Sequence, residues 1–470
     1  MNTSSVLKQL SLMATIIGGL ALLCALFSHY TGDEASARGF LLSGVIGALI
    51  GGSILILLWD VPSRTSAREG LLFVIGFWVL MPIIAAPPFW SSGVSSDWIQ
   101  ASFEAVSNLT TTGATAGDAT QPESIRYWRS ILQFIGGVAG VIMAVVVLAA
   151  LNLTGPGVHK SHLLTLAKDD MFGRIGRITM TVAAVYGVMA LFGTISIAAS
   201  GAELIDAVTR SVAAISTSST LRGVAGAYAY SPFAAGIITF LLFVGATNIA
   251  LHTDILRQKS WKVYVKDIEI HALILGIIIF AALLSIMNNR LDLRYLVEAL
   301  SFISTSGLNV TGSISVLDTL PQPVPDLFVF VGASALSTAG GLKITRVIVL
   351  MSRALTEFRR LSFENSTATL KYQGRGRKDN IVVGVWVYLI AYIGATIIIG
   401  MLLALSGVDA ETSFRSAIGA ISNTGPLVDS AVLDQSPSSI TLVLLSLGCI
   451  LGRIEVLALA PLFSRDFWRK

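Results

Sequence analysis

The chain has 470 residues, of which 54% are hydrophobic and only 13% are charged. Soluble globular proteins carry about 25% charged residues, so this chain is depleted by about half. The formal net charge of +4 is modest and does not indicate a nucleic-acid-binding protein. The long apolar runs do not alternate with polar positions, which favours membrane helices over a β-barrel. We therefore expect an all-α polytopic membrane protein.

Ten apolar segments are long enough to cross about 30 Å of hydrocarbon as helices. The first follows Lys8 and is longer than the core of a signal peptide, so we interpret it as a retained membrane helix. The predicted spans lie near residues 10–28, 39–59, 70–90, 129–152, 177–199, 232–255, 268–287, 325–351, 381–406 and 439–463. Cys24 and Cys449 fall inside apolar runs and are expected to be buried thiols.

Four shorter segments interrupt these spans, near residues 100–112, 204–218, 296–306 and 414–424. Each is mildly apolar and ends in Ser, Thr and usually Gly. Such a segment is too short to cross a membrane and suits a re-entrant helix that enters the bilayer and turns back. The unit of span, short helix, turn and span then occurs four times.

This repeat predicts an N-terminal two-helix extension at 1–65 and four repeats at 66–155, 156–260, 261–360 and 361–470. Internal repeats of this size indicate pseudo-symmetry about an axis along the membrane normal. We therefore expect two N-terminal spans followed by four membrane–pore-loop–membrane repeats around one central pore.

The distribution of Lys and Arg predicts cytoplasmic N- and C-termini. With this orientation the inner loops hold most of the 32 Lys and Arg residues, notably in segments 257–266 and 353–378. The four short segments then all enter from the outside. Acidic residues on that side would either raise the local cation concentration or act as ordinary solvated charges. They include Asp97, Glu104, Asp118, Glu298, Asp409 and Glu411.

The four short segments align without gaps as Ala105–Gly113, Ser211–Ser219, Ala299–Gly307 and Ala417–Gly425. A dehydrated K⁺ needs a ring of oxygens in place of its hydration water, and backbone carbonyls supply them without full charges. Glycine adopts the unusual dihedrals of such a loop at least cost. The C-terminal dipole of each short helix favours a cation, and the Ser and Thr hydroxyls add oxygens and hold the loop.

We predict that the last three residues of each aligned stretch form an ion-selectivity filter. These residues are Thr111, Thr112, Gly113, Thr217, Ser218, Ser219, Thr305, Ser306, Gly307, Asn423, Thr424 and Gly425. The alternative is that each end is only a helix C-cap, but four such ends in register on one side favour the filter. Ser219 departs from the pattern because serine resists positive φ. We expect its loop to sit differently, or to offer a hydroxyl in place of a carbonyl, with weaker K⁺ selectivity.

Span eight has Gly, Ala, Ser and Thr at 332–343, where Leu or Ile would be expected. Small polar residues with a Gly-Gly pair indicate a broken helix that lines a cavity. We predict a gate beneath the filter that consists of Gly340, Gly341, Lys343, Arg453 and Glu455. The alternatives are a small-residue packing face, Lys343 reaching toward the cytoplasm, and a purely structural ion pair of Arg453 with Glu455 or another acid.

Several motifs together resemble the TrkH-like branch of the TrkH/KtrB (Trk/Ktr/HKT) superfamily of bacterial potassium transporters. They are Leu109-Thr-Thr-Thr-Gly-Ala-Thr115, Ser337-Thr-Ala-Gly-Gly-Leu-Lys343, Leu451-Gly-Arg-Ile-Glu455, Arg68-Glu-Gly-Leu-Leu-Phe and Gln133-Phe-Ile-Gly-Gly137. The resemblance extends from about residue 66 to the C-terminus. The two N-terminal spans are similar to the pair that distinguishes the TrkH branch.

The resemblance implies four repeats around one pore per subunit, a homodimer, and a cytoplasmic TrkA-like RCK regulatory partner that carries the nucleotide site. It implies filter roles for the Thr112–Gly113, Ser306–Gly307 and Thr424–Gly425 positions. It also implies an intramembrane gating loop at Gly340–Lys343, faced by Arg453. The second repeat departs from the family, because Ser218 and Ser219 stand where a glycine-containing turn is usual.

We therefore expect the ion-conducting subunit of a bacterial K⁺ uptake system, channel-like and gated by the RCK partner, in the inner membrane. One alternative is a Na⁺-permeable or Na⁺/K⁺ variant of the same pore. Another is an alternating-access Na⁺-coupled symporter, for which Glu455 is the only deep acidic candidate. We expect no enzymatic activity, since no nucleophile–base or metal-ligand pattern is present. We expect no cofactor on the chain, K⁺ or Na⁺ as the transported ion, and contacts with membrane lipid but not with nucleic acid.

Overall fold

The structure is a computed structural model. It describes residues 3–61, 67–117, 121–150, 171–219, 231–312, 316–362, 371–372, 375–376, 379–429, 432–433 and 437–456. Within these residues the regular structure is helical, apart from one antiparallel pair of two-residue strands, β1 (Lys371–Tyr372) and β2 (Arg375–Gly376). The predicted all-α class is therefore confirmed.

The helices of the first half are α1 (Thr3–Tyr30), α2 (Glu34–Gly44), the π-helix η1 (Val45–Gly51), α3 (Gly52–Leu57), α4 (Ala67–Ala85), α5 (Pro87–Ser91), α6 (Trp98–Leu109), α7 (Glu123–Ala150), α8 (Met171–Ala199), α9 (Leu204–Ile215) and α10 (Pro232–Ala246). Those of the second half are α11 (Ile249–Gln258), α12 (Lys262–Val265), α13 (Ile268–Met287), α14 (Arg294–Ile303), α15 (Val316–Thr319), α16 (Pro323–Val331), α17 (Ile344–Ser362), α18 (Asp379–Leu405), α19 (Ala410–Ser422), α20 (Gly425–Asp429) and α21 (Ser439–Ile454).

Seven helical segments among the described residues are long and apolar enough to cross a membrane, and an eighth if the bent pair α10–α11 is one span. The seven are Thr3–Tyr30, Glu34–Leu57, Arg68–Ser91, Glu123–Val146, Ile178–Ala199, Ile268–Met287 and Val382–Leu405. They coincide with seven of the ten predicted spans. The multi-pass membrane character of the chain follows from them.

The other three predicted spans are not straight helices of full length. The segment 232–255 turns by 102° between α10 and α11, so the predicted span there is at most a broken one. Asn248 causes the new start, because its side chain caps α11 by accepting from the Ala250 amide at 3.0 Å. The predicted break at 332–343 is present, since α16 ends at Val331 and α17 begins at Ile344. α21 ends at Ile454, and residues 457–463 of that span lie outside the described part.

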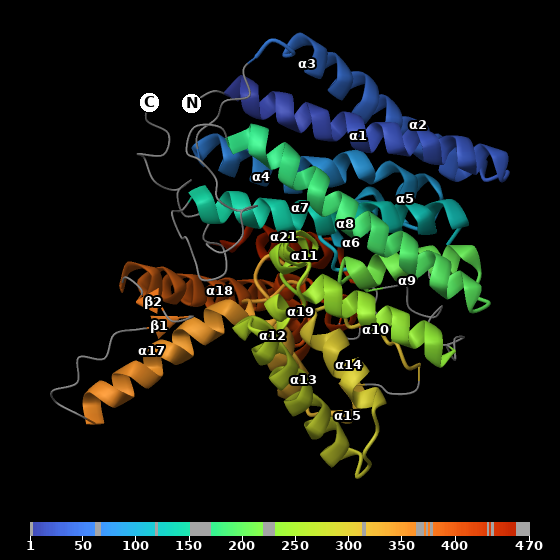
Figure 1. Cartoon of the computed structure of the whole chain (residues 1–470). Coiled ribbons are helices and arrows are strands. Elements are labelled where there is room, and N and C mark those ends of the chain that lie inside the picture. Colours follow the sequence, from blue (N-terminus) through green and yellow to red (C-terminus); the bar gives the residue numbers. More distant parts are fainter. Residues whose placement is uncertain are drawn as a thin grey trace.

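The N-terminal helices pack closely through small residues. α1 packs against α2, η1 and α4, and Figure 1 shows α1, α2 and α3 together at one edge of the molecule. A Cβ on Gly47 would lie 2.6 Å from the Ala14 carbonyl oxygen, so the two backbones approach as closely as glycine allows. Such contacts favour association in a bilayer, where lipid tails remove the hydrophobic drive between helices.

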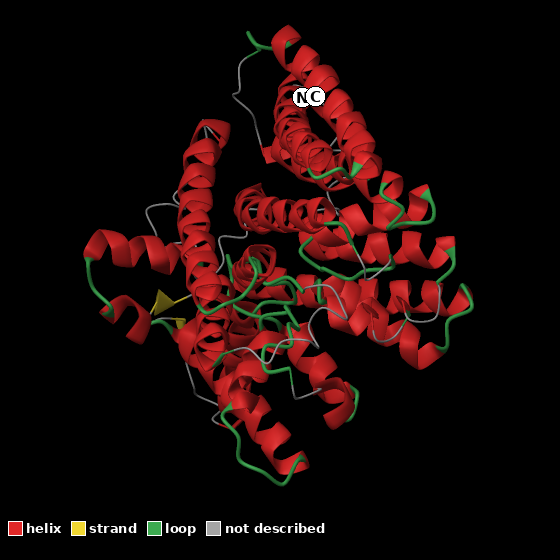
Figure 2. Ribbon diagram, turned by 90° about the vertical axis from the view of Figure 1, so that its right-hand side faces the viewer, coloured by secondary structure: helices red, strands yellow, loops and turns green. Residues whose placement is uncertain are grey.

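Four short helices, α6, α9, α14 and α19, occupy the four predicted re-entrant segments. Each packs against a neighbouring long helix, namely α7, α8, α13 and α18 respectively. Asp97 and Asp409 begin α6 and α19 by accepting from the amides of Gln100 at 2.8 Å and Thr412 at 3.0 Å. Loops gather near the middle of the molecule and are enclosed by helices (Figure 2). The packing thus brings irregular chain into the protein interior.

Gly18→Val is expected to lower the melting temperature of the purified protein in detergent. A Cβ at Gly18 would lie 2.7 Å from the Gly47 Cα, and overpacking of this kind costs about 1–3 kcal/mol. Gly19→Val is the matched control, because no atom lies within 4 Å of a Cβ at that position. Heating followed by size-exclusion chromatography measures both variants. Equal melting temperatures would contradict the close approach of α1 and η1.

Candidate functional site

The four short helices end in the same backbone turn. The aligned residues Thr111, Thr217, Thr305 and Asn423 have left-handed φ values of 58°, 49°, 62° and 56°. The next amide in each loop donates to a carbonyl of the last helical turn: Thr112 to Ser107 at 2.8 Å, Ser218 to Ala213 at 2.8 Å, Ser306 to Ser301 at 3.1 Å and Thr424 to Gly419 at 2.7 Å. This is the Schellman pattern. The C-cap alternative therefore describes the local geometry of all four ends correctly.

None of these four left-handed residues is glycine, which is unusual. A non-glycine residue in this region costs on the order of 1 kcal/mol and persists only where its surroundings hold it. The same left-handed position recurs in four segments that align without gaps, and in three of them a threonine holds it, which indicates a common architectural requirement. A cap by itself would be satisfied more cheaply by glycine or asparagine.

The last residue of each aligned stretch, which is glycine in three loops and Ser219 in the other, divides the four loops into two pairs. Gly113 and Gly307 have φ values of 74° and 61°, and in both loops an aligned serine, Ser107 or Ser301, donates its hydroxyl at 2.7 Å to the residue after the glycine. Gly425 instead begins α20, and neither it nor Ser219 has positive φ. The second loop therefore does differ from the first and third. The resistance of serine to positive φ does not fully explain this difference, because the fourth loop differs as well although it has a glycine.

The four turns contact one another in chain order and close a ring. Ser219 Oγ donates to the Thr112 carbonyl at 3.1 Å, which joins loops one and two. Ser306 Oγ donates to the Ser218 carbonyl at 2.7 Å, which joins loops two and three. A Cβ on Gly307 would lie 2.7 Å from Cγ of Pro426, and Asn423 Nδ2 donates to Thr112 Oγ1 at 3.1 Å. These contacts link loop four to both loop three and loop one.

We call residues 110–113, 216–219, 304–307 and 422–425 the polar ring. Every Ser, Thr and Asn in it is at most 2% exposed, so the ring is buried. Buried polar atoms nearly always have a hydrogen-bond partner. Three oxygens of the ring have none among the described residues: Thr111 Oγ1, Asn423 Oδ1 and Thr424 Oγ1. With four helix C-termini directed at it, this cluster of uncharged oxygens suits a cation.

Glycines of the long helices let the ends of the short helices approach. A Cβ on Gly136 of α7 or Gly452 of α21 would overlap the carbonyl oxygen of Leu109 or Ile421. A Cβ on Gly245 of α10 would lie 2.5 Å from the Ile215 carbonyl oxygen. Leu109, Ile215 and Ile421 are aligned positions, so three of the four short helices are approached by a glycine in the same way. The sequence contained this signal, but only the packing shows what the glycines face.

Two of the predicted outer acids are buried, so the interpretation of these two as ordinary solvated charges was wrong. Glu104 is 0% exposed, pairs with Arg129 and accepts from the amides of Ala116 at 2.8 Å and Gly117 at 2.9 Å. The aligned Glu298 is 1% exposed and accepts from the Thr311 amide at 2.9 Å. These carboxylates hold the chain that leaves the polar ring.

Among the other outer acids, Asp97 and Asp409 cap helices. Hydrogen bonds from Thr412 lower the pKa of Asp409, which suits its role at the start of α19. Glu411 lies in the first turn of the same helix. Asp118 lies outside the described residues.

The irregular segment 332–343 contacts three loops of the polar ring. The Gly340 amide donates to Thr305 Oγ1 at 2.7 Å, and Thr217 Oγ1 donates to Thr338 Oγ1 at 3.1 Å. A Cβ on Gly340 would overlap the Ser422 carbonyl oxygen, so glycine is required there. Gly341 has a φ of 78°, so its backbone conformation explains a glycine there. Lys343 has the same φ of 78° without being glycine.

Arg453 joins this segment to the remaining loop. Its Nε donates to the Thr110 carbonyl at 2.6 Å, and its Nη1 donates to the Thr338 carbonyl at 2.7 Å. None of the salt bridges within the described residues includes Arg453. It is 8% exposed, so a buried cation lies against the polar ring with carbonyl oxygens as its partners. A cation in that position is a functional candidate by default.

Glu455 does not pair with Arg453, so that alternative was wrong. Arg346 Nη2 lies 2.5 Å from Glu455 Oε2, and the Arg346 guanidinium carbon lies 3.7 Å from the centroid of the Tyr388 ring. Lys343 Nζ donates to the Ala339 carbonyl and turns back into its own segment. The structure thus brings Gly340 and Arg453 to the polar ring, whereas Glu455 belongs to a separate cluster.

Gly136→Ala is expected to destabilise the protein by about 1–3 kcal/mol, because the added methyl would overlap the Leu109 carbonyl. Gly394→Ala is the control, since nothing lies within 4 Å of a Cβ there and alanine is the better helix former. Unfolding of each variant in rising SDS, followed by circular dichroism, provides the comparison. A Gly136→Ala curve that coincides with the wild type would refute the backbone contact.

Three comparisons place the chain among known proteins. A sequence model of the family described as "TrkH: Cation transport protein" matches residues 39–285. The chain is 28% identical to the Trk system potassium uptake protein TrkH of Salmonella typhimurium over 494 aligned residues, with 100% of both chains covered. It is also 28% identical to the Trk system potassium uptake protein TrkG of Escherichia coli (strain K12) over 454 residues, with 93% of each covered.

The fold is similar to a solved structure. The crystal structure of the potassium transporter TrkH from Vibrio parahaemolyticus superposes with a TM-score of 0.86 at 22% sequence identity, and the match covers 100% of both chains. At this level of identity the match shows a shared fold.

Proposed function

Because the chain belongs to the TrkH family of cation transport proteins, we propose that it is the ion-conducting transmembrane subunit of a bacterial K⁺ uptake system. The names of the Salmonella and Escherichia relatives support K⁺ as the transported ion. The family is one of transporters rather than enzymes. The single observation that carries the proposal is the closed, buried polar ring at four helix C-termini.

The proposed filter consists of residues 111–113, 217–219, 305–307 and 423–425. A K⁺ ion that enters the ring exchanges water for carbonyl and hydroxyl oxygens. The unpartnered oxygens of Thr111, Asn423 and Thr424 support this role, since ion binding would satisfy them. The helix dipoles add negative potential without a full charge, so that binding stays weak enough for the ion to leave.

The proposed gate is the segment 332–343 together with Arg453. The segment contacts loops two, three and four of the ring. Arg453 connects it to loop one at Thr110. A cation that leaves the filter on this side would meet both an obstructing chain and a positive charge. Opening requires the bonds from Gly340 and Thr338 to the ring to be exchanged for others, a two-state change of the kind that a regulatory partner can bias.

The arrangement around this pore is also part of the proposal. It comprises the two-helix extension 1–65, four repeats at 66–155, 156–260, 261–360 and 361–470, a homodimer, and cytoplasmic termini in the inner membrane. The basic segments 257–266 and 353–378 support a cytoplasmic inner face, where a TrkA-like RCK subunit would bind.

One observation favours a less selective variant that also passes Na⁺. Ser219 Oγ donates to the Thr112 carbonyl at 3.1 Å, so one of the oxygens available to an ion is already engaged. The symporter alternative finds less support from Glu455, the acidic candidate that the sequence offered for it, because Glu455 is paired with Arg346.

Ser219→Ala and Ser219→Gly are expected to raise the ratio of K⁺ to Na⁺ flux severalfold, because each frees the Thr112 carbonyl. Because the φ of residue 219 is not positive, alanine fits the same backbone, and Ser219→Ala removes only the hydroxyl. Growth of K⁺-uptake-deficient cells and ⁸⁶Rb⁺ and ²²Na⁺ flux into liposomes measure the effect. Ser200→Gly, outside the ring, is the control.

An unchanged flux ratio in both Ser219 variants would exclude Ser219 as the selectivity determinant. A wild-type protein that supports neither growth nor flux of K⁺ or Na⁺ would overturn the proposed function itself.

Arg453→Ala is expected to raise basal flux in the absence of a regulatory partner by about tenfold, which corresponds to about 1.4 kcal/mol of barrier. It removes both the buried charge and the link between Thr110 and Thr338. Shortening Gly340–Lys343 is expected to act in the same direction. Arg290→Ala, at an exposed position, is the control for loss of a charge. Flux that is unchanged in both gate variants would rule out the gate assignment.

A further inference from the structure

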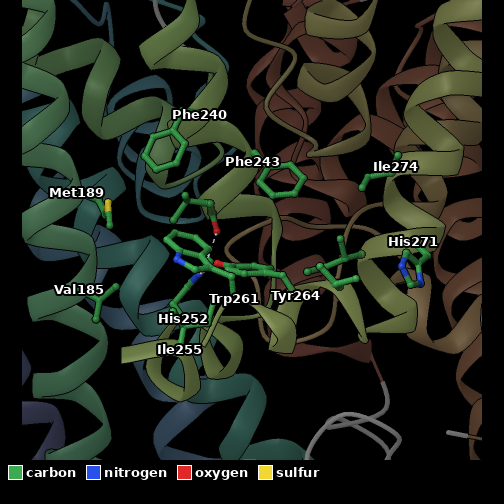
Figure 3. Close-up of a pocket in the computed structure, with 13 residues that line it drawn as sticks. Val185, Met189, Phe240, Phe243, His252, Ile255, Trp261, Tyr264, His271 and Ile274 are labelled. Atoms are coloured by element: carbon green, nitrogen blue, oxygen red, sulfur yellow. Dashed lines mark hydrogen bonds between the residues drawn. The ribbon is translucent and has the colours of Figure 1, made fainter. Parts of the chain in front are cut away.

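An apolar cavity of about 620 Å³ lies beside the bend between α10 and α11. Helices α8, α10, α11, α12 and α13 supply its walls (Figure 3). The rings of Phe240 and Phe243 lie on one side of the space, and those of Trp261 and Tyr264 lie on the other. Its volume falls within the range of about 300–1,000 Å³ that is typical of small-molecule sites. The proposed filter and gate do not use this cavity.

Two walls of the cavity belong to helices that face lipid. In the most apolar 18-residue stretch of each of the spans Ile178–Ala199 of α8 and Ile268–Met287 of α13, only 28% of the residues are buried. Val188 is 64% exposed, and Ile274, which lines the cavity, is 41% exposed. The cavity therefore continues a surface that acyl chains would cover in a bilayer.

Basic residues alternate in the chain with the lining residues Trp261, Tyr264 and Val265. Lys259, Lys262 and Lys266 are exposed, in a segment that also contains Arg257. Trp261 is 76% exposed and stacks on Tyr264 with 6.2 Å between ring centroids. Exposed aromatic rings of this kind mark the level of lipid headgroups, and clustered Lys and Arg beside a membrane helix attract anionic lipid.

We propose that the cavity holds an acyl chain of an anionic phospholipid whose phosphate group is bound by Lys262 and Lys266. The apolar lining accounts for the acyl chain, and Lys262 and Lys266, which directly follow the lining residues Trp261 and Val265 in the sequence, account for the charge. The inference relies on the proposed orientation, in which segment 257–266 faces the anionic inner leaflet.

Hydrogen bonds of His252 connect Tyr264, which lines the cavity, to the bend between α10 and α11. His252 Nε2 lies 3.0 Å from the Val244 carbonyl, which can only accept, so Nε2 carries the proton in the neutral imidazole. His252 Nδ1 therefore accepts from the Tyr264 hydroxyl. Burial raises the pKa of Tyr264 to about 12, which keeps this donor protonated. A chain packed on Tyr264 thus stabilises the contact that holds α11 against α10.

The bend in turn holds the gate segment. The amides of Ser334 and Thr338 donate to the carbonyls of Ala246 and Gly245, each at 3.2 Å. In the opposite direction, the Ile249 amide donates to the Leu336 carbonyl at 3.2 Å. The segment 332–343 is therefore attached to the cavity wall as well as to the polar ring. Bound lipid favours the present position of the segment and lowers basal flux.

Native mass spectrometry of the purified protein, titrated with phosphatidylglycerol or phosphatidylethanolamine, tests the site. The wild type is expected to retain phosphatidylglycerol in preference to phosphatidylethanolamine. Ile274→Trp fills the cavity and is expected to weaken this retention about tenfold. Ile278→Trp, one turn along the lipid-facing side of α13 and outside the lining, is the matched control and keeps it.

The charge is tested separately. Lys262→Gln with Lys266→Gln is expected to abolish the preference for phosphatidylglycerol, whereas Arg359→Gln with Arg360→Gln, in another exposed basic cluster, preserves it. Equal retention of the two lipids by the wild type would overturn the anionic ligand. Equal behaviour of Ile274→Trp and Ile278→Trp would overturn the cavity as its site. These measurements need no ion flux, so their failure leaves the transport proposal standing.

The coupling is tested in liposomes. Basal ⁸⁶Rb⁺ flux through the wild type is expected to be lower with phosphatidylglycerol than without it, and Ile274→Trp is expected to remove the difference. A wild-type flux that is independent of phosphatidylglycerol would overturn the coupling between cavity and gate.

Discussion

The structure depends on four helix C-termini that meet inside the protein. The last carbonyls of an α-helix have no partner within the helix, and in a membrane no bulk water is available to satisfy them. Here each terminus turns through a left-handed residue, and the turns bond to one another around a closed ring. The glycines at 136, 245 and 452 and the carboxylates of Glu104 and Glu298 hold this arrangement in place.

The segment 332–343 obeys the same constraint. Its backbone is irregular and buried, so its polar groups must bond to protein. They do so in three directions: to the polar ring through Gly340 and Thr338, to Arg453, and to the α10–α11 bend. Because these bonds satisfy one short piece of chain, a change at any of the three places alters the balance at the other two. That geometry makes the segment suitable for control by a partner or a lipid.

Two arginines in the interior, Arg346 and Arg453, have contrasting electrostatic environments. Arg346 is neutralised by Glu455 and covered by Tyr388. Arg453 is held by carbonyl oxygens, and its charge remains uncompensated by any carboxylate among the described residues. An ion pair has little field beyond its own surroundings, whereas the charge of Arg453 lies against the polar ring without a carboxylate to offset it among the described residues.

Hydropathy and residue size by themselves determined the class of the protein, seven spans, the four short helices and the break at 332–343, because each of these depends on a short stretch of chain. The aligned ends of the short helices located the candidate filter for the same reason. Only the tertiary structure decided that Glu104 and Glu298 are buried, that Glu455 pairs with Arg346, and that the four loops touch. The Ser219–Thr112 contact joins residues 107 positions apart, and local patterning carries no information about such a pair.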